Sequence, residues 1–174
     1  EDYFKGPAKI KNMTWKIIPE GSSRTIALEA GEVDFIVEVE SMDADRLKEN
    51  SDITVLQYND TSHNWLMLNN EAPGLDNQDV RHAINSAIDK ESVVTVAYNG
   101  MATASWTMTP SNFPGTTEEN ADTYDVEKAK EYLDASGVDP SSVTFSIITS
   151  DDTKKRAAEV IQANLKEIGI ECTI

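Results

Sequence analysis

The pattern of apolar and polar residues predicts a helix near the middle of the chain. Within residues 76–88 the apolar positions recur at spacings of three and four, which places them on one face of a helix. Asp76 or Asn77 can cap the first turn, because both side chains accept hydrogen bonds from free backbone N–H groups. The apolar face consists of Val80, Ala83, Ile84, Ala87 and Ile88.

A second helix is predicted directly after Asp89, whose side chain can accept hydrogen bonds from the free backbone N–H groups of the first turn. Its apolar stripe runs over residues 93–97, and Asn99-Gly100 ends it, since both residues tolerate the left-handed conformation that follows many helices. The two helices therefore meet at Asp89. Such a junction is either a corner within one core or the point where the chain passes from one lobe to another.

The chain before this helix pair has strand composition in several places. Residues 13–18 and 33–39 are expected to form strands, with a helix capped by Ser22 or Ser23 between them. This order requires a crossover, and a right-handed parallel connection is the usual one. After a short helix starting at Ser41, two further strands are expected around residues 53–55 and 65–68.

The chain after the helix pair repeats this order of strand, helix and strand near its end. Residues 100–122 are irregular and longer than an ordinary connection, so they form a functional loop or a loosely ordered one. Asp125 caps the next helix, which ends at Gly137. Residues 143–147 and 170–174 alternate like strands around another helix. Two strand-helix-strand units predict α/β architecture with two partial sheets.

Composition excludes several kinds of function. The chain of 174 residues has 31 acidic and 15 basic residues, a formal charge of −16, and no compact basic stripe, which argues against a nucleic-acid partner. No apolar run is long enough to cross a membrane. Cys172 is the only cysteine, which excludes an internal disulfide and a cysteine-based metal site.

The candidates for chemistry are few. His63 and His82 are the only histidines, and neither has the spacing of a zinc site, so His82 is expected to have a structural or surface role. A nucleophile hypothesis rests on Ser62 and His63 with an unidentified acid, although the chain lacks a Gly-x-Ser-x-Gly elbow. Trp65 and Trp106 suit either a ligand pocket or a core, because each combines a large apolar face with one hydrogen-bond donor.

Several motifs, in collinear order along nearly the whole chain, resemble those of the extracellular solute-binding proteins of ABC importers, of the dipeptide and oligopeptide type. The similar segments are YFKGP at residues 3–7, TWKIIP at 14–19, LEAGEVDFI at 28–36, MLNN at 67–70, DVRHAINSAID at 79–89, YDVEKAKEYLDASG at 124–137 and LKEIGIECTI at 165–174. Residues 61–65 depart from the family pattern, since His63-Asn64-Trp65 stands where members often have several tyrosines.

The resemblance implies an internal fragment of a two-lobed protein. The expected fold is α/β, a partial periplasmic-binding-protein-like fold of class II and of the peptide-binding type. Residues 1–89 would be part of the first lobe and residues 90–174 part of the second, with a hinge near Asp89. Residues 88–90 should then separate two units that share few apolar contacts.

The resemblance also implies a function. The expected protein is not an enzyme and has no cofactor or metal. It captures dipeptides or oligopeptides outside the membrane or in the periplasm, and passes them to an ABC permease. It would be a monomer, lipid-anchored in its full-length parent. The alternatives are a hydrolase or esterase lobe using Ser62 and His63, a binder of a nickel complex or an oligosaccharide, and a purely structural or antigenic segment.

Five residues are the expected ligand contacts in this interpretation. The order of the motifs places one group at the strand that leads to the hinge, one residue just after the hinge, and one at the start of the irregular loop. They are His63, Asn64, Trp65, Thr95 and Trp106.

Overall fold

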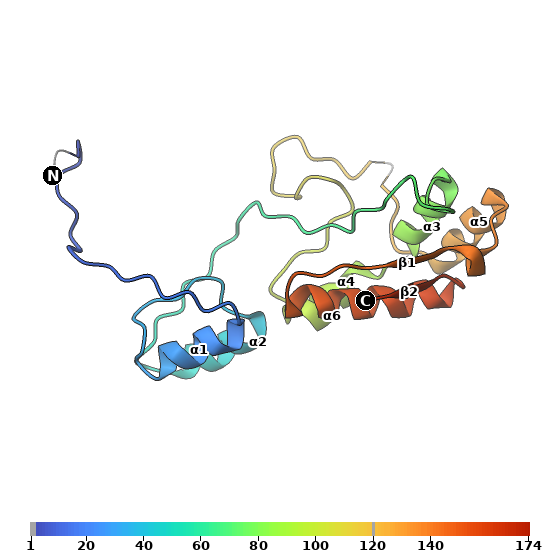
Figure 1. Cartoon of the computed structure of the whole chain (residues 1–174). Coiled ribbons are helices and arrows are strands. Elements are labelled where there is room, and N and C mark those ends of the chain that lie inside the picture. Colours follow the sequence, from blue (N-terminus) through green and yellow to red (C-terminus); the bar gives the residue numbers. More distant parts are fainter. Residues whose placement is uncertain (1–2, 120) are drawn as a thin grey trace. The chain divides into compact units, whose positions relative to one another are not determined.

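The chain forms two compact units, Glu1–Val55 and Leu56–Ile174, in a computed structural model that describes residues 3–119 and 121–174 (Figure 1). The first unit contains helices α1 (Gly21–Glu29) and α2 (Ser41–Glu49). The second contains α3 (Gln78–Ala87), α4 (Lys90–Tyr98), α5 (Val126–Ser136), the short 3-10 helix η1 (Pro140–Ser142), β1 (Thr144–Ser146), α6 (Asp152–Glu167) and β2 (Glu171–Thr173).

Helix α1 starts earlier than predicted and ends as predicted. The carbonyl of Glu20 accepts the Arg24 N–H (3.1 Å), so the first turn begins before either Ser22 or Ser23 can act as its cap. At the other end Gly31 has a φ of 69°, and the next residue, Glu32, donates its N–H to Ala27 (2.8 Å). This is the Schellman arrangement, which a glycine favours.

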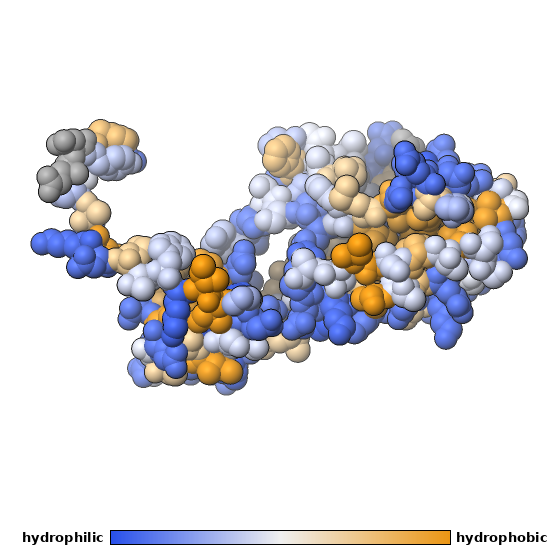
Figure 2. Space-filling model, in the orientation of Figure 1, coloured by the Kyte–Doolittle hydropathy of each residue, from blue (hydrophilic) through white to orange (hydrophobic). Residues whose placement is uncertain are grey.

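The strands expected in the first unit are absent from its described residues. Residues 13–18 and 33–39 have no backbone partner there, and Trp15 and Ile17 are 79% and 91% exposed. A strand needs a neighbouring ladder and an apolar surface to cover one of its faces, and residues 3–55 supply neither. Figure 2 shows hydrophobic residues at the surface of this unit. The buried side chains among its described residues are Thr25, Ala27, Ala44 and Leu47.

The strand-helix-strand unit at the end of the chain is confirmed. β1 and β2 are parallel, with Phe145 opposite Cys172, and α6 forms the crossover and contacts β2 (Figure 1). The Gln162 amide of α6 donates to the Cys172 carbonyl (2.6 Å) and so fastens the helix to the strand. The two partial sheets that were expected reduce to this one pair among the described residues.

Two segments before α3 were predicted to be strands and form none. Around residues 53–55 and 65–68 the structure records no ladder. Residues 65–68 nevertheless show the expected alternation of buried and exposed side chains. Leu66 and Leu68 pack against the core, whereas Met67 is exposed. The apolar pattern of residues 65–68 therefore predicted which side chains are buried, but no described segment pairs with these residues to form a strand.

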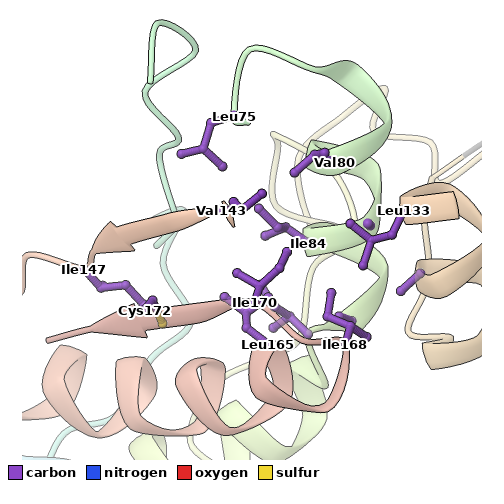
Figure 3. Close-up of a cluster of buried hydrophobic side chains, with 14 of the residues drawn as sticks. Leu75, Val80, Ile84, Leu133, Val143, Ile147, Leu165, Ile168, Ile170 and Cys172 are labelled. Atoms are coloured by element: carbon purple, nitrogen blue, oxygen red, sulfur yellow. The ribbon is translucent and has the colours of Figure 1, made fainter. Parts of the chain in front are cut away.

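Helix α3 supplies the centre of the core of Leu56–Ile174. Its apolar face packs against α5 and also contacts α6. Figure 3 shows Ile84 of α3 pointing toward Ile170, at the entry to β2, and Leu165 of α6 lying close by. The whole buried cluster consists of Leu75, Val80, Ala83, Ile84, Ala87, Ile88, Ala129, Leu133, Val143, Ile147, Ala158, Leu165, Ile168, Ile170 and Cys172.

The caps predicted for three helices of this unit are confirmed. Asn77 Oδ1 accepts the Asp79 N–H (2.8 Å) at the start of α3, Asp89 Oδ1 accepts the Ser92 N–H (3.1 Å), and Asp125 Oδ1 accepts the Lys128 N–H (3.0 Å). Each carboxylate or amide oxygen satisfies a donor that the first turn of a helix leaves free.

The core continues across the junction at Asp89. Val80 and Ile84 lie before it and Leu133 and Leu165 after it, in the same buried cluster. The expectation that residues 88–90 separate two units with few shared apolar contacts is therefore wrong, because the face of α3 is buried by elements that follow Asp89. The assignment of residues 1–89 and 90–174 to two lobes concerns a longer protein and stays a prediction.

No helix in the described ranges combines the length and the apolar composition that a bilayer crossing requires.

Truncation of the core residue Ile84 tests this account of the fold. Ile84 is 1% exposed, so Ile84→Ala should lower the free energy of unfolding of Leu56–Ile174 by about 2–5 kcal/mol. Ile148→Ala is the matched control, because Ile148 is 95% exposed and its loss should change stability by less than about 0.5 kcal/mol. Urea unfolding followed by far-ultraviolet circular dichroism measures both, and equal losses would show that α3 is not central.

Candidate functional site

The first group of candidate residues follows a tight turn at Asp60. The Asp60 carboxylate accepts the Ser62 N–H (2.9 Å) and the Ser62 hydroxyl (2.8 Å), and these bonds, the hydroxyl one foremost, hold the pKa of Asp60 below its ordinary value. Beyond the turn the rings of His63 and Trp65 lie 5.3 Å apart. Asn64 is exposed and Trp65 is 53% exposed, so an aromatic pair with a neighbouring amide faces solvent.

The same turn bears on the hydrolase hypothesis. The Ser62 hydroxyl donates to Asp60, and in the described part of the chain no hydrogen bond joins Ser62 to His63. A serine nucleophile needs a base within hydrogen-bonding reach that can take its proton. The carboxylate that holds Ser62 belongs to a turn and has no imidazole between itself and the hydroxyl, so the arrangement is that of a turn rather than a triad.

Trp106 occupies a half-buried position in the irregular loop. The Nζ atom of Lys90, the first residue of α4, lies 4.3 Å from the centroid of the Trp106 ring, which is a cation–π contact. The same ammonium donates to Asn85 Oδ1 (3.0 Å) on α3. Trp106 is therefore held against the junction of α3 and α4.

Thr95 lies on the exposed side of α4. Its hydroxyl donates to the Glu91 carbonyl one turn earlier (2.9 Å), which leaves the oxygen able to accept a further hydrogen bond. Among the residues that the structure describes, no hydrogen bond or ring contact joins Thr95 or Trp106 to the His63–Trp65 pair. The irregular loop does reach the turn before that pair, because the Asn112 amide donates to the Asp60 carbonyl (3.0 Å).

A polar cluster closes the other end of the irregular loop. His82 Nδ1 lies 2.5 Å from Asp122 Oδ2, and the Tyr132 hydroxyl donates to Asp122 Oδ1 (3.2 Å). Because the carboxylate only accepts, Nδ1 of His82 carries the proton of this hydrogen bond. The His82 and Tyr132 rings stack at 5.2 Å, and Lys128 Nζ lies 3.9 Å from Asp122 Oδ1. Asp122 thus fastens the loop to both α3 and α5.

Lys90 and Asp122 in this region have shifted pKa values. Burial lowers the pKa of Lys90, and the negative charge of Asp122 opposes that shift. Burial also works against the ionised form of Asp122, but hydrogen bonds from His82, Tyr132 and Asn85, together with the charge of His82, outweigh it. The pKa of Asp122 therefore lies below its ordinary value.

Sequence reasoning missed this second cluster. The sequence predicts only a structural or surface role for His82, and it predicts no role for Asn85, Lys90 or Asp122. The available signal was the spacing of His82 and Asn85, which lie three residues apart and therefore on one side of α3. Nothing local predicts that Asp122, 40 residues after His82, completes the cluster.

The described residues contain no group of three or more His, Cys, Asp or Glu side chains arranged to hold a metal ion.

Comparisons with known proteins agree on one family. A sequence model of the family described as "Bacterial extracellular solute-binding proteins, family 5 Middle" matches residues 1–174. Heme-binding protein A of Haemophilus influenzae is 29% identical in an alignment 177 residues long. The alignment covers 98% of this chain and 32% of that protein. The glutathione-binding protein of Pectobacterium atrosepticum is 26% identical over 175 residues, which cover 99% of this chain and 34% of that protein.

A solved structure has the same fold. The periplasmic binding protein DppA of Helicobacter pylori, associated with an ABC transporter and bound to the peptide STSA, matches with a TM-score of 0.72 and 31% identity. The match covers 90% of this chain and 31% of that protein. The predicted fold class, an α/β partial fold of the periplasmic-binding-protein type, is confirmed by this likeness. The chain spans about a third of the length of these relatives.

The shifted pKa of Asp122 gives a testable pH dependence. A carboxylate whose pKa is lower in the folded than in the unfolded chain adds stability above about pH 4, and this stability is lost as the pH falls through the folded-state pKa. The difference in free energy of unfolding between wild type and Asp122→Asn should therefore shrink on acidification from about pH 6 to pH 2. Urea titrations at several pH values measure it.

The control for losing one negative charge is Asp134→Asn, on the exposed side of α5. If the difference between wild type and Asp122→Asn is the same at every pH, Asp122 is not held in its ionised form by the cluster.

Proposed function

Since the chain belongs to family 5 of the bacterial extracellular solute-binding proteins, we propose that it forms part of the substrate-binding component of an ABC importer. In this proposal the whole protein captures dipeptides or oligopeptides and delivers them to a membrane permease. The observation that carries the proposal is the match of the family across all 174 residues. Family members are not enzymes, so the hydrolase alternative through Ser62 and His63 is not retained.

Peptides are the proposed ligand class for two reasons. The similar protein of Helicobacter pylori has a peptide bound, and the similar protein of Pectobacterium atrosepticum binds glutathione, which is itself a tripeptide. The family also contains a protein named for heme binding, so members differ in ligand chemistry. A nickel complex or an oligosaccharide would need a different set of contacting groups and serves as a competing ligand in the test below.

The proposed ligand surface consists of the residues chosen from the sequence. Trp65 and Trp106 offer apolar faces and indole N–H donors, and the Asn64 amide can both donate to and accept from a peptide backbone. Thr95 offers an acceptor oxygen on α4, and the His63 ring lies beside Trp65. Such a surface holds extended backbone through hydrogen bonds and tolerates varied side chains, which suits a general peptide carrier.

The proposed mechanism is binding without chemistry. A ligand enclosed between two lobes shifts the balance of open and closed forms by the difference in its affinity for them. No bond of the ligand is made or broken. We place the whole protein on the extracellular face of the membrane or in the periplasm, as a monomer carrying a lipid anchor in the longer parent.

Calorimetry on the longer parent protein tests the ligand class. The tetrapeptide STSA should bind with a dissociation constant of about 1 μM or tighter, which is roughly −8 kcal/mol. The isolated 174-residue chain should bind it more weakly than about 1 mM, because the chain spans only about a third of the length of its relatives. Binding of a nickel complex, heme or an oligosaccharide in place of every peptide would overturn the peptide proposal and leave the family membership intact.

Substitution of Trp106 tests the ligand surface. In the longer parent, Trp106→Ala should weaken peptide binding by about 1–3 kcal/mol, because a half-buried aromatic side chain is a typical anchor. The melting temperature of the unliganded protein should stay nearly unchanged. Met108→Ala, at an exposed position of the same loop, is the control. A large drop in melting temperature with unaltered affinity would assign Trp106 to the core.

A further inference from the structure

Lys90 occupies a position that is unfavourable for a lysine by itself. It is the first residue of α4, directly after the cap Asp89, and a positive charge at a helix N-terminus opposes the helix dipole. Burial of the side chain adds to this cost and lowers the pKa of the ammonium. A polar or acidic residue would suit the helix start better, and the contacts that Lys90 makes with Trp106 and Asn85 offset this cost.

Two contacts fix the direction of the Lys90 ammonium. It lies 4.3 Å from the centroid of the Trp106 ring and donates to Asn85 Oδ1 at 3.0 Å. A primary ammonium has three donors and a flexible stem, so one strong acceptor is needed to hold it over an aromatic face. Asn85 provides this acceptor from the neighbouring helix.

Asn85 is in turn oriented by the polar cluster at the end of the loop. Its side chain hydrogen-bonds to Asp122, and since its oxygen accepts from Lys90, the amide NH₂ is the donor in that bond. Asp122 is held by His82 and Tyr132. A continuous chain of contacts therefore runs from Trp106 near the start of the irregular loop, through Lys90 and Asn85, to Asp122 at its end.

We propose that Lys90 is the positioning residue of Trp106: oriented by Asn85, its ammonium holds the indole ring in one place before any ligand arrives. The relevance of this to ligand capture rests on the function proposed above. The loop thereby presents a preformed aromatic face, which reduces the conformational entropy lost on binding. Lys90 itself contacts the indole and not the ligand, so its effect on binding passes through Trp106.

Fluorescence of a single-tryptophan variant tests the proposal without any ligand. The chain has three tryptophans, so Trp15→Phe with Trp65→Phe leaves Trp106 as the only reporter. In this background Lys90→Met keeps the length of the side chain and removes its charge, and should raise the acrylamide quenching of Trp106 about two-fold. Lys90→Arg keeps a cation over the ring and should restore the quenching to nearly its original value.

Asn85→Leu supplies a second, independent variant, which removes the acceptor at similar volume and leaves Lys90 in place. It should also raise the quenching, by less than Lys90→Met. Far-ultraviolet circular dichroism confirms that each variant keeps its helices. Unchanged quenching in both Lys90→Met and Asn85→Leu would overturn the proposal, and so would equal quenching in Lys90→Met and Lys90→Arg.

The positioning role of Lys90 and the proposed peptide ligand can be refuted independently, because the fluorescence measurements are made without peptide. A chain that shows the expected quenching while its parent binds no peptide would keep the positioning role of Lys90 and refute the proposed ligand.

Discussion

The burial of one face of α3 is the constraint on which the rest of Leu56–Ile174 depends. Val80, Ala83 and Ile84 have almost no exposed surface, and their neighbours come from α5, α6 and the entries to both strands. The other side of the same helix carries His82 and Asn85, which hold the two ends of the irregular loop through Asp122 and Lys90. One helix therefore supports both the core and the irregular loop, and its contacts help to set where Trp106 lies.

The two units differ in what can stabilise them. The second has a contiguous buried cluster with members in α3, α5, α6 and β2, and Val93 of α4 and Phe145 of β1 pack against it. The first has two short helices, and the buried side chains among its described residues are small apart from Leu47. Because burial of apolar surface is the main favourable term in folding, most of the stability of this chain should reside in Leu56–Ile174. The candidate residues all lie in that more stable unit, which suits a site that must hold a defined shape.

The sequence predicted most of what depends on local chemistry. The helix caps at Asn77, Asp89 and Asp125, the apolar face of α3 and the last strand-helix-strand unit could all be read from spacing and residue type. Apart from the pairing of β1 with β2, contacts between residues far apart in the sequence could not be predicted. The alternation at Trp15 and Ile17 has the appearance of a strand, yet a strand exists only where another segment pairs with it. For the same reason the hydrogen bond between His82 and Asp122 could not be predicted, since no local pattern connects a helix with a residue 40 positions later.

Hydrogen exchange of the backbone amides, followed residue by residue in the 174-residue chain, tests most directly whether burial of α3 organises the structure. The amides of α3 should exchange most slowly, together with those of α5 and α6 that pack on the same cluster, whereas amides of α1 and α2 should exchange much faster. Equal protection in α1, α2 and α3, or exchange in α3 as fast as in the irregular loop, would contradict the account.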